Sequence, residues 1–166
     1  MYKELNVPQR TIMTPGPVES EPRVLRAMSM PIIGQFDPSF LAIMDEVKEM
    51  LKYVFQTNNT QNYAVDGTSR SGMEALMCSL IEPGDKVLVP TYGRFGNMLI
   101  EIADRSGAQV HSISKEWGKV FGADEVIDAI KRTNPKIVAV VHGETSTGCM
   151  QPLGEIGKYC RENNIL

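Results

Sequence analysis

The sequence has few of the residues that mark several classes of protein. Its 166 residues include only three cysteines and no Cys-x-x-Cys pair, so it indicates neither a disulfide framework nor a zinc or redox motif. Acidic residues outnumber basic ones by 20 to 17 and no basic run occurs, so the chain has no electrostatic footprint for nucleic acid. No apolar run reaches the length that spans a bilayer. We therefore expect no metal, no nucleic acid and no membrane among its ligands.

The N-terminus has no signal-peptide pattern. Residues 1–8 are polar and mixed, without the apolar stretch that directs secretion. Together with the small number of cysteines, this predicts a soluble protein in a reducing, cytoplasmic compartment. We expect Cys78 to be a buried free thiol and not a nucleophile, because it lies on the apolar face of the helix expected at 73–80.

The content of 42% hydrophobic and 22% charged residues is typical of a globular chain with one sizeable core. From residue 64 onward, short apolar runs alternate with helical patterns, and glycine or proline marks the connections. This alternation predicts an α/β fold with a parallel sheet. The expected strands are 86–89, 108–113 and 137–141, and the expected helices are 73–80, 97–106, 124–132 and 153–162.

The first third of the chain differs from the rest. Residues 1–17 are polar and rich in proline, which predicts either an extended arm or a frayed terminus. A short helix is expected at 22–28. A longer helix should begin at Asp37-Pro38, where an acidic N-cap precedes a proline at the first helical position. Apolar residues follow at helical spacing up to Val54, so we expect this helix to lie on a core.

A small polar loop precedes the helix that starts near residue 70. We expect a short strand to end at Val65 and the loop to lie at the helix N-terminus, where unpaired N–H groups bind anions. Gly67 permits close approach of a ligand, Thr68 and Ser69 add hydroxyl donors, and Arg70 adds a cation. The loop is therefore either a phosphate cup or a plain helix cap beside a solvated arginine. It matches neither the dinucleotide nor the nucleoside-triphosphate fingerprint.

Two further polar loops follow expected strands. Phe95 lies between two glycines in a loop after residue 89, and residues 142–148 follow the strand that ends at 141. In a parallel sheet these loops fall on the edge that binds ligands, which predicts a crevice for a flat phosphorylated molecule. Taken singly, Phe95 is also typical of a core aromatic, His142 of a hydrogen-bonded structural residue, and Glu144 of a buried, paired carboxylate.

Five motifs in this order resemble a known family. They are Thr-Pro-Gly-Pro at 14–17, Gly-Gln-Phe-Asp-Pro at 34–38, Gly-Thr-Ser-Arg-Ser-Gly-Met-Glu-Ala at 67–75, Tyr-Gly-Arg-Phe-Gly at 92–96 and His-Gly-Glu-Thr-Ser-Thr-Gly at 142–148. Each motif is weak alone, but their order and spacing resemble the class V, fold-type I pyridoxal-phosphate aminotransferases over nearly the whole chain. The resemblance implies a three-layer α/β large domain with a mostly parallel sheet, incomplete in this chain.

The resemblance also implies roles for five residues. Thr68, Ser69 and Arg70 match the positions that hold the phosphate of pyridoxal 5'-phosphate, in agreement with the cup inferred from the residues themselves. Phe95 matches the aromatic residue that stacks on the pyridine ring, where relatives often have Trp. Thr145 matches the hydroxyl residue that contacts the phenolic oxygen of the ring.

Two substrate-binding residues are implied in the first third of the chain. Gly16 resembles the backbone position that meets the substrate carboxylate, and Gln35 lies in a stretch placed near the substrate, often across a homodimer interface. Arg70 stands where alanine–glyoxylate relatives commonly have His. Together with Gln35, it favours (S)-ureidoglycine as amino donor and glyoxylate as acceptor, a reaction of purine (allantoin) catabolism.

No catalytic residue of the family falls within this chain. The Schiff-base lysine and the aspartate that pairs with the pyridine nitrogen are expected downstream, so the 166 residues alone are expected to be inactive. We expect an N-terminal arm at 1–20 and the first part of the cofactor-binding large domain at 21–166, with its remainder and a small domain outside the sequence.

Two other functions remain open. One is alanine–glyoxylate or serine–pyruvate transamination by the same cofactor. The other is a phosphate-ligand binding fragment without chemistry, which the cup by itself would equally support.

Overall fold

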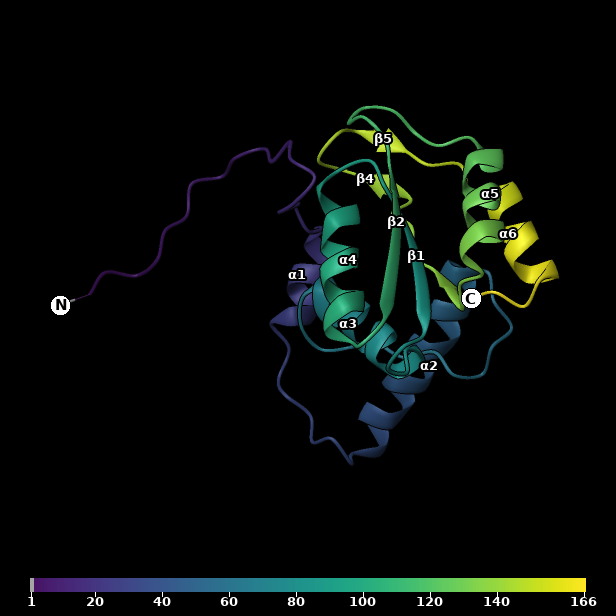
Figure 1. Ribbon diagram of the computed structural model, residues 1–166. Coiled ribbons are helices and arrows are strands. Elements are labelled where there is room, and N and C mark those ends of the chain that lie inside the picture. Colours follow the sequence, from purple (N-terminus) through teal and green to yellow (C-terminus); the bar gives the residue numbers. More distant parts are fainter. Residues whose placement is uncertain (1) are drawn as a thin grey trace. The chain divides into compact units, whose positions relative to one another are not determined.

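A computed structural model describes residues 2–166 and divides the chain after Tyr63 into two compact units (Figure 1). The first unit contains helices α1 (Pro22–Met28) and α2 (Pro38–Phe55). The second unit contains α3 (Ser69–Leu80), β1 (Lys86–Thr91), α4 (Arg94–Arg105), β2 (Gln109–Ser114), α5 (Ala123–Thr133), β3 (Ile137–Val138), β4 (Gly143–Glu144), β5 (Cys149–Met150) and α6 (Gly154–Glu162). The boundary expected at residue 20 stays a prediction.

Both helices of the first unit form where the sequence predicts them. The Asp37 carboxylate caps α2 by accepting a hydrogen bond of 2.8 Å from the Ser39 N–H, and Pro38 occupies the first helical position. The expectation that α2 lies on a core is wrong. No residue of α2 is buried, and Val54 is 68% exposed, because no described element of this unit covers the apolar face.

The second unit is built on a parallel sheet, as predicted. The strand order is β2-β1-β3, and β1 pairs in parallel with both neighbours. The strand expected at 137–141 ends at Val138, and only the Ala139 N–H continues the ladder, donating to the Leu88 carbonyl at 2.9 Å. At the other side of β3, the Val138 N–H donates to the Leu166 carbonyl at 2.8 Å, so the last residue pairs with this strand.

Helices cover both faces of this sheet, which gives the three predicted layers. Alternate side chains of β1 point to opposite faces, so Val87 and Val89 pack with α3 and α4, whereas Leu88 packs with α5 and α6. Figure 1 shows α3 and α4 on one side of β1 and β2, and α5 and α6 on the other. All these β1 side chains are fully buried, as expected for a strand covered on both faces.

Three local predictions for the second unit are wrong. No strand ends at Val65, because no described strand pairs with the residues before the loop. Helix α4 begins at Arg94, so Phe95 lies in its first turn and not in a loop. Cys78 is exposed, with its Sγ 3.6 Å from the Ser106 Oγ, because it lies one position beyond Met77, the residue of α3 that is buried against the sheet.

Candidate functional site

Two connections come together at the carboxyl end of the sheet. One leads from β1 into α4, and the other leads from β3 into the antiparallel β4–β5 hairpin. The buried Tyr92 joins them, because its hydroxyl donates to the Val141 carbonyl at 2.5 Å. Burial raises the pKa of Tyr92, and the nearby charge of Glu144 raises it further. The phenol therefore stays protonated and remains a hydrogen-bond donor.

The carboxylate of Glu144 is buried at the N-terminus of α4. Glu144 is only 1% exposed. Its Oε2 accepts hydrogen bonds from the N–H groups of Phe95 at 2.9 Å and Gly96 at 3.3 Å. Oε1 accepts from the Ser146 hydroxyl at 2.6 Å and from its N–H at 3.2 Å. The Ser146 oxygen in turn accepts from the Arg94 N–H at 3.0 Å. The negative charge thus lies where a helix N-terminus stabilises it.

Gly93 makes room for this carboxylate. A Cβ at residue 93 would collide with Cγ and Cδ of Glu144 and would lie 2.7 Å from its Oε2. The backbone of Gly93 is extended, with φ of 178°, so the glycine is needed for space and not for its conformation. Sequence reasoning found neither this glycine nor the Glu144 contacts, because the two partners are about fifty residues apart.

The N-terminus of α3 differs from that of α4. Thr68 occupies the N-cap position, but its side chain makes no capping hydrogen bond. Gly67 has φ of +129°, and a Cβ there would lie 2.6 Å from the Ser71 Oγ, so the turn has the close-packed, glycine-dependent shape expected of an anion cup. Thr68, Ser69 and Arg70 are all exposed around it. Of these two helix ends, that of α4 already holds the Glu144 carboxylate, whereas that of α3 has no side-chain cap and can accept an external anion.

Two of the predicted cofactor residues line one cavity. A hollow of about 190 Å³ is lined by Arg70, Arg94, Phe95, Asn97, Met98 and Glu101. Arg70 comes from the first turn of α3 and Phe95 from the first turn of α4, so the fold brings a cation and an aromatic ring to the same space. The volume is below the roughly 300 Å³ of usual ligand pockets, so these residues provide part of a ligand site.

Thr145 lies in the turn of the β4–β5 hairpin, between Glu144 and Ser146, and its side chain is exposed. Both neighbours bond to the first turn of α4, so Thr145 is held at the end of the helix that carries Phe95. His142 is structural: its Nδ1 is 2.8 Å from the Gln151 carbonyl, and its own carbonyl accepts from the Gln151 N–H. The alternative of a structural His142 is thereby confirmed, and Glu144 is buried as its alternative had it, with N–H and hydroxyl groups as its hydrogen-bond partners.

The two predicted substrate residues belong to the first unit. Gly16 and Gln35 are both exposed there, and a Cβ at Gly16 would meet no atom within 4 Å. Their roles stay predictions.

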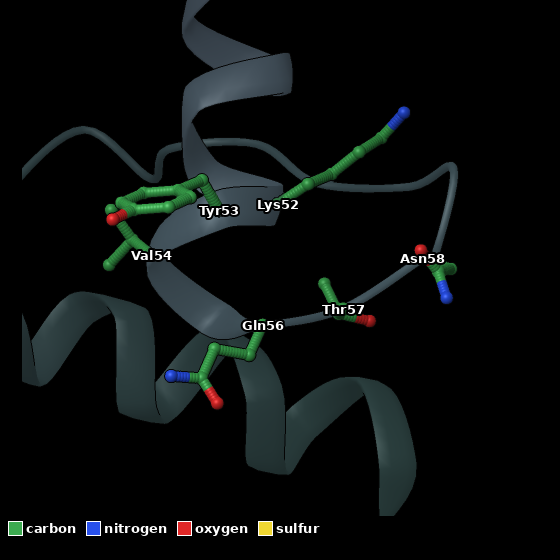
Figure 2. A pocket seen from close by; sticks show the side chains of 6 residues that line it. All are labelled: Lys52, Tyr53, Val54, Gln56, Thr57 and Asn58. Atoms are coloured by element: carbon green, nitrogen blue, oxygen red, sulfur yellow. The ribbon is translucent and has the colours of Figure 1, made fainter.

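A second hollow lies at the C-terminal end of α2 (Figure 2). It is lined by Lys52, Tyr53, Val54, Gln56, Thr57 and Asn58. Figure 2 shows the side chains of Lys52 and Gln56 pointing in opposite directions, so they do not converge on one ligand. The Lys52 Nζ is also paired with Glu49 at 2.6 Å. None of the predicted site residues lines this hollow, and its polar groups do not form a binding site.

Within residues 2–166, no helix has the length and apolar character needed to cross a membrane, and no group of three or more His, Cys, Asp or Glu side chains is placed to bind a metal ion. The features that fit a ligand are the uncapped end of α3, its exposed hydroxyls and arginine, and the neighbouring aromatic ring. This set of donors fits a phosphorylated aromatic cofactor, because the helix end takes the phosphate and Phe95 offers a ring for stacking.

Comparison with known proteins points to one family. Residues 29–166 match the family described as Aminotransferase class-V. The chain is 58% identical to (S)-ureidoglycine–glyoxylate transaminase of Bacillus subtilis, over 99% of the chain and 39% of that protein. It is 42% identical to alanine–glyoxylate aminotransferase of Drosophila melanogaster, over 98% of the chain and 41% of that protein.

A solved structure gives the same result. The crystal structure of ureidoglycine–glyoxylate aminotransferase from Bacillus subtilis superposes with a TM-score of 0.96 at 58% identity, over 99% of this chain and 42% of that one. The chain therefore spans about two fifths of the length of the relatives it matches.

Proposed function

The chain belongs to the class-V aminotransferases, which are pyridoxal-phosphate-dependent enzymes, and from this membership we propose that the whole protein transfers an amino group from (S)-ureidoglycine to glyoxylate. The observation that supports cofactor binding by this chain is the shared cavity of Arg70 and Phe95. The choice of donor is supported by the higher identity to the ureidoglycine enzyme, 58% against 42% for an alanine–glyoxylate enzyme.

In this proposal the chain provides contacts to the phosphate and the ring of the cofactor and none of its covalent chemistry. The N-terminus of α3, with Thr68, Ser69 and Arg70, holds the phosphate through backbone donors, hydroxyls and a guanidinium. Phe95 stacks on one face of the ring and Thr145 donates a hydrogen bond to its phenolic oxygen. When bound, the cofactor acts as an electron sink for the amino acid from which the amino group is removed.

The substrate contacts come from the first unit in this proposal. The Gly16 backbone binds the substrate carboxylate, and the Gln35 amide hydrogen-bonds to the donor. An amide has both donor and acceptor atoms and so suits the ureido group of (S)-ureidoglycine better than the methyl group of alanine.

We also propose that the whole protein is a cytoplasmic homodimer. The apolar face of α2 supports self-association, because Ile43 is 46% and Met50 58% exposed in this chain. Exposed apolar area of this kind is typical of a surface that a partner covers. The lysine and the aspartate expected of the family lie outside this sequence in the proposal, so the 166 residues alone should not transaminate glyoxylate.

The test is the visible spectrum of the whole protein reconstituted with pyridoxal phosphate. (S)-Ureidoglycine or alanine is added without acceptor, and the rate at which the absorption band of the bound cofactor disappears is compared for the two donors. We expect (S)-ureidoglycine to react much faster.

The other outcomes distinguish the alternatives. Faster reaction with alanine would assign the protein to the alanine–glyoxylate group, which the 42% identical relative makes the second candidate. Absence of any cofactor band would leave a phosphate-binding fold without this chemistry. Transamination by the isolated 166 residues would show that the chain itself contains the catalytic groups that the proposal places outside it.

A further inference from the structure

We propose that Glu144 is a positioning residue, which fixes the distance between Phe95 and Thr145 and so sets the geometry of the two side chains assigned to the cofactor ring. This inference rests on the proposed function, because it concerns the same site. It adds a residue that touches neither cofactor nor substrate and that acts through hydrogen bonds to its neighbours.

The first argument is connectivity. Phe95 and Thr145 come from different connections, one after β1 and one after β3, and the last residues paired between these strands, Leu88 and Val138, come before both connections. Glu144 belongs to the same connection as Thr145, and its Oε2 reaches the other connection by accepting from the Phe95 N–H at 2.9 Å. Its Oε1 accepts from the Ser146 hydroxyl at 2.6 Å, and the Ser146 oxygen accepts from the Arg94 N–H at 3.0 Å, which makes a second link. Ser146 and Glu144 flank Thr145 directly, so the carboxylate holds both ring residues at once.

The second argument is that the Glu144 side chain is held in one position. Glu144 is only 1% exposed, and its two oxygens accept four hydrogen bonds from the protein. Gly93 packs so closely that any larger residue would displace the Glu144 side chain. A buried carboxylate with this many donors adopts one position, because any other would leave charge or N–H groups unsatisfied.

The third argument concerns charge. The carboxylate occupies the positive end of α4, so a second anion is disfavoured there, and the cofactor phosphate is left with the end of α3. The phosphate cup at α3 is therefore separate from the Glu144 carboxylate, so the proposed role of Glu144 concerns the ring residues and not the phosphate.

The test compares two ligands of the whole protein. Inorganic phosphate probes the cup alone, and pyridoxal phosphate probes the cup together with the ring residues. Glu144→Gln keeps the size of the side chain but replaces one acceptor oxygen by an NH₂ group, which cannot accept from Ser146. We expect the dissociation constant for pyridoxal phosphate to rise roughly tenfold, while that for phosphate changes by less than about twofold.

Two further variants separate positioning from general destabilisation. Asp85→Asn removes another hydrogen-bonded carboxylate, which accepts from the Glu82 N–H at 2.8 Å and from Lys136 at the opposite end of β1. It should alter neither affinity. In combination with Phe95→Ala, Glu144→Gln should cause less further loss of pyridoxal phosphate affinity than it does alone, since part of its effect passes through that ring and part through Thr145.

Ser146 keeps the proposal testable if Glu144→Gln does not fold. Ser146→Ala leaves the carboxylate in place and removes one of its donors, so it should weaken pyridoxal phosphate selectively but less. Ser146→Thr retains the hydroxyl and should restore the affinity.

Three results would overturn the inference. Equal loss of affinity for both ligands would show general damage, unchanged affinity for both would show no role, and fully additive effects of Glu144→Gln and Phe95→Ala would show independent action. Failure of the unmodified protein to bind pyridoxal phosphate would refute the proposed function itself, and this result is visible before any variant is made.

Discussion

Single residues at the carboxyl end of the sheet make the N-termini of two neighbouring helices differ in their capacity to bind an anion. Helix α4 receives an internal carboxylate from Glu144, whereas α3 has no side-chain cap from Thr68. A helix end that is already neutralised has little left to offer an external anion, so the binding capacity lies with α3. The same carboxylate needs Gly93, because no other residue leaves space for it.

We expect Gly93→Ala to destabilise the fold by about 1–3 kcal/mol, since the new methyl group would overlap the Glu144 side chain and force a rearrangement at the start of α4. The measurement is the free energy of unfolding in denaturant. Gly157→Ala is the matched control, because a Cβ there meets no atom within 4 Å inside α6. It should stabilise by up to about 1 kcal/mol through helix propensity. Equal stability of the two variants would contradict the steric argument.

At the scale of elements, the two ends of the sheet differ: the candidate site lies at the carboxyl end of the strands, and an ion pair lies at the opposite end. The N-terminal end of β1 is held by Asp85, whose carboxylate pairs with Lys136 just before β3. The pKa of Asp85 lies below its ordinary value because Lys136 hydrogen-bonds to the charged form, with a further contribution from the Glu82 N–H. The same contact raises the pKa of Lys136.

This pair predicts a pH dependence of stability. Because the pKa of Asp85 is lower in the folded chain than in the unfolded chain, its contribution is complete above about pH 4 and is lost as the pH falls through the folded pKa. Asp85→Asn should therefore cost stability at pH 6, and the difference from the unmodified chain should shrink towards pH 2. Denaturant unfolding across this range measures it.

The control for the pH experiment is a more exposed pair. Asp128 is 3.7 Å from Lys131 with its side chain 62% exposed, so Asp128→Asn should change the pH profile little. A constant difference between the Asp85→Asn variant and the unmodified chain at all pH values would exclude the proposed linkage.

At the scale of the whole chain, stability is concentrated in the second unit. All buried residues of the core, from Met77 to Cys160, lie in residues 64–166, and α1 and α2 contain no buried residue. A segment without buried apolar contacts opens at little free-energy cost. The unequal distribution of the core predicts unequal protection along the chain.

We expect hydrogen exchange of the 166-residue chain to be slowest in β1, where both faces of the strand are covered, and fast throughout residues 2–63. Residues 64–166 prepared alone should show the same protection in β1. Protection in α2 equal to that in β1 would show that residues 2–63 are stabilised by contacts beyond their own unit.

Much of the site could be predicted from local chemistry. The turn at Gly67, the hydroxyls beside it and Arg70 identify a helix end suited to an anion, and such a signal lies within a few consecutive residues. The alternation of strands and helices likewise predicts an α/β fold with a parallel sheet, because hydrophobic periodicity records which faces are buried, whereas the three layers were implied by the family resemblance. The cofactor, the donor and the roles of Gly16 and Gln35 came from the resemblance of ordered motifs.

Only the tertiary structure decided which residues from distant parts of the chain contact one another. It placed Phe95 in the first turn of α4 because a carboxylate about fifty residues away caps that helix, and it gave Arg70 and Phe95 one cavity. It also showed that β3 is short and that the apolar face of α2 is uncovered in this chain. The physical reason is the same in each case. Local propensity and periodicity act over a few residues, whereas capping, strand pairing and burial depend on partners that only the folded chain brings within contact distance.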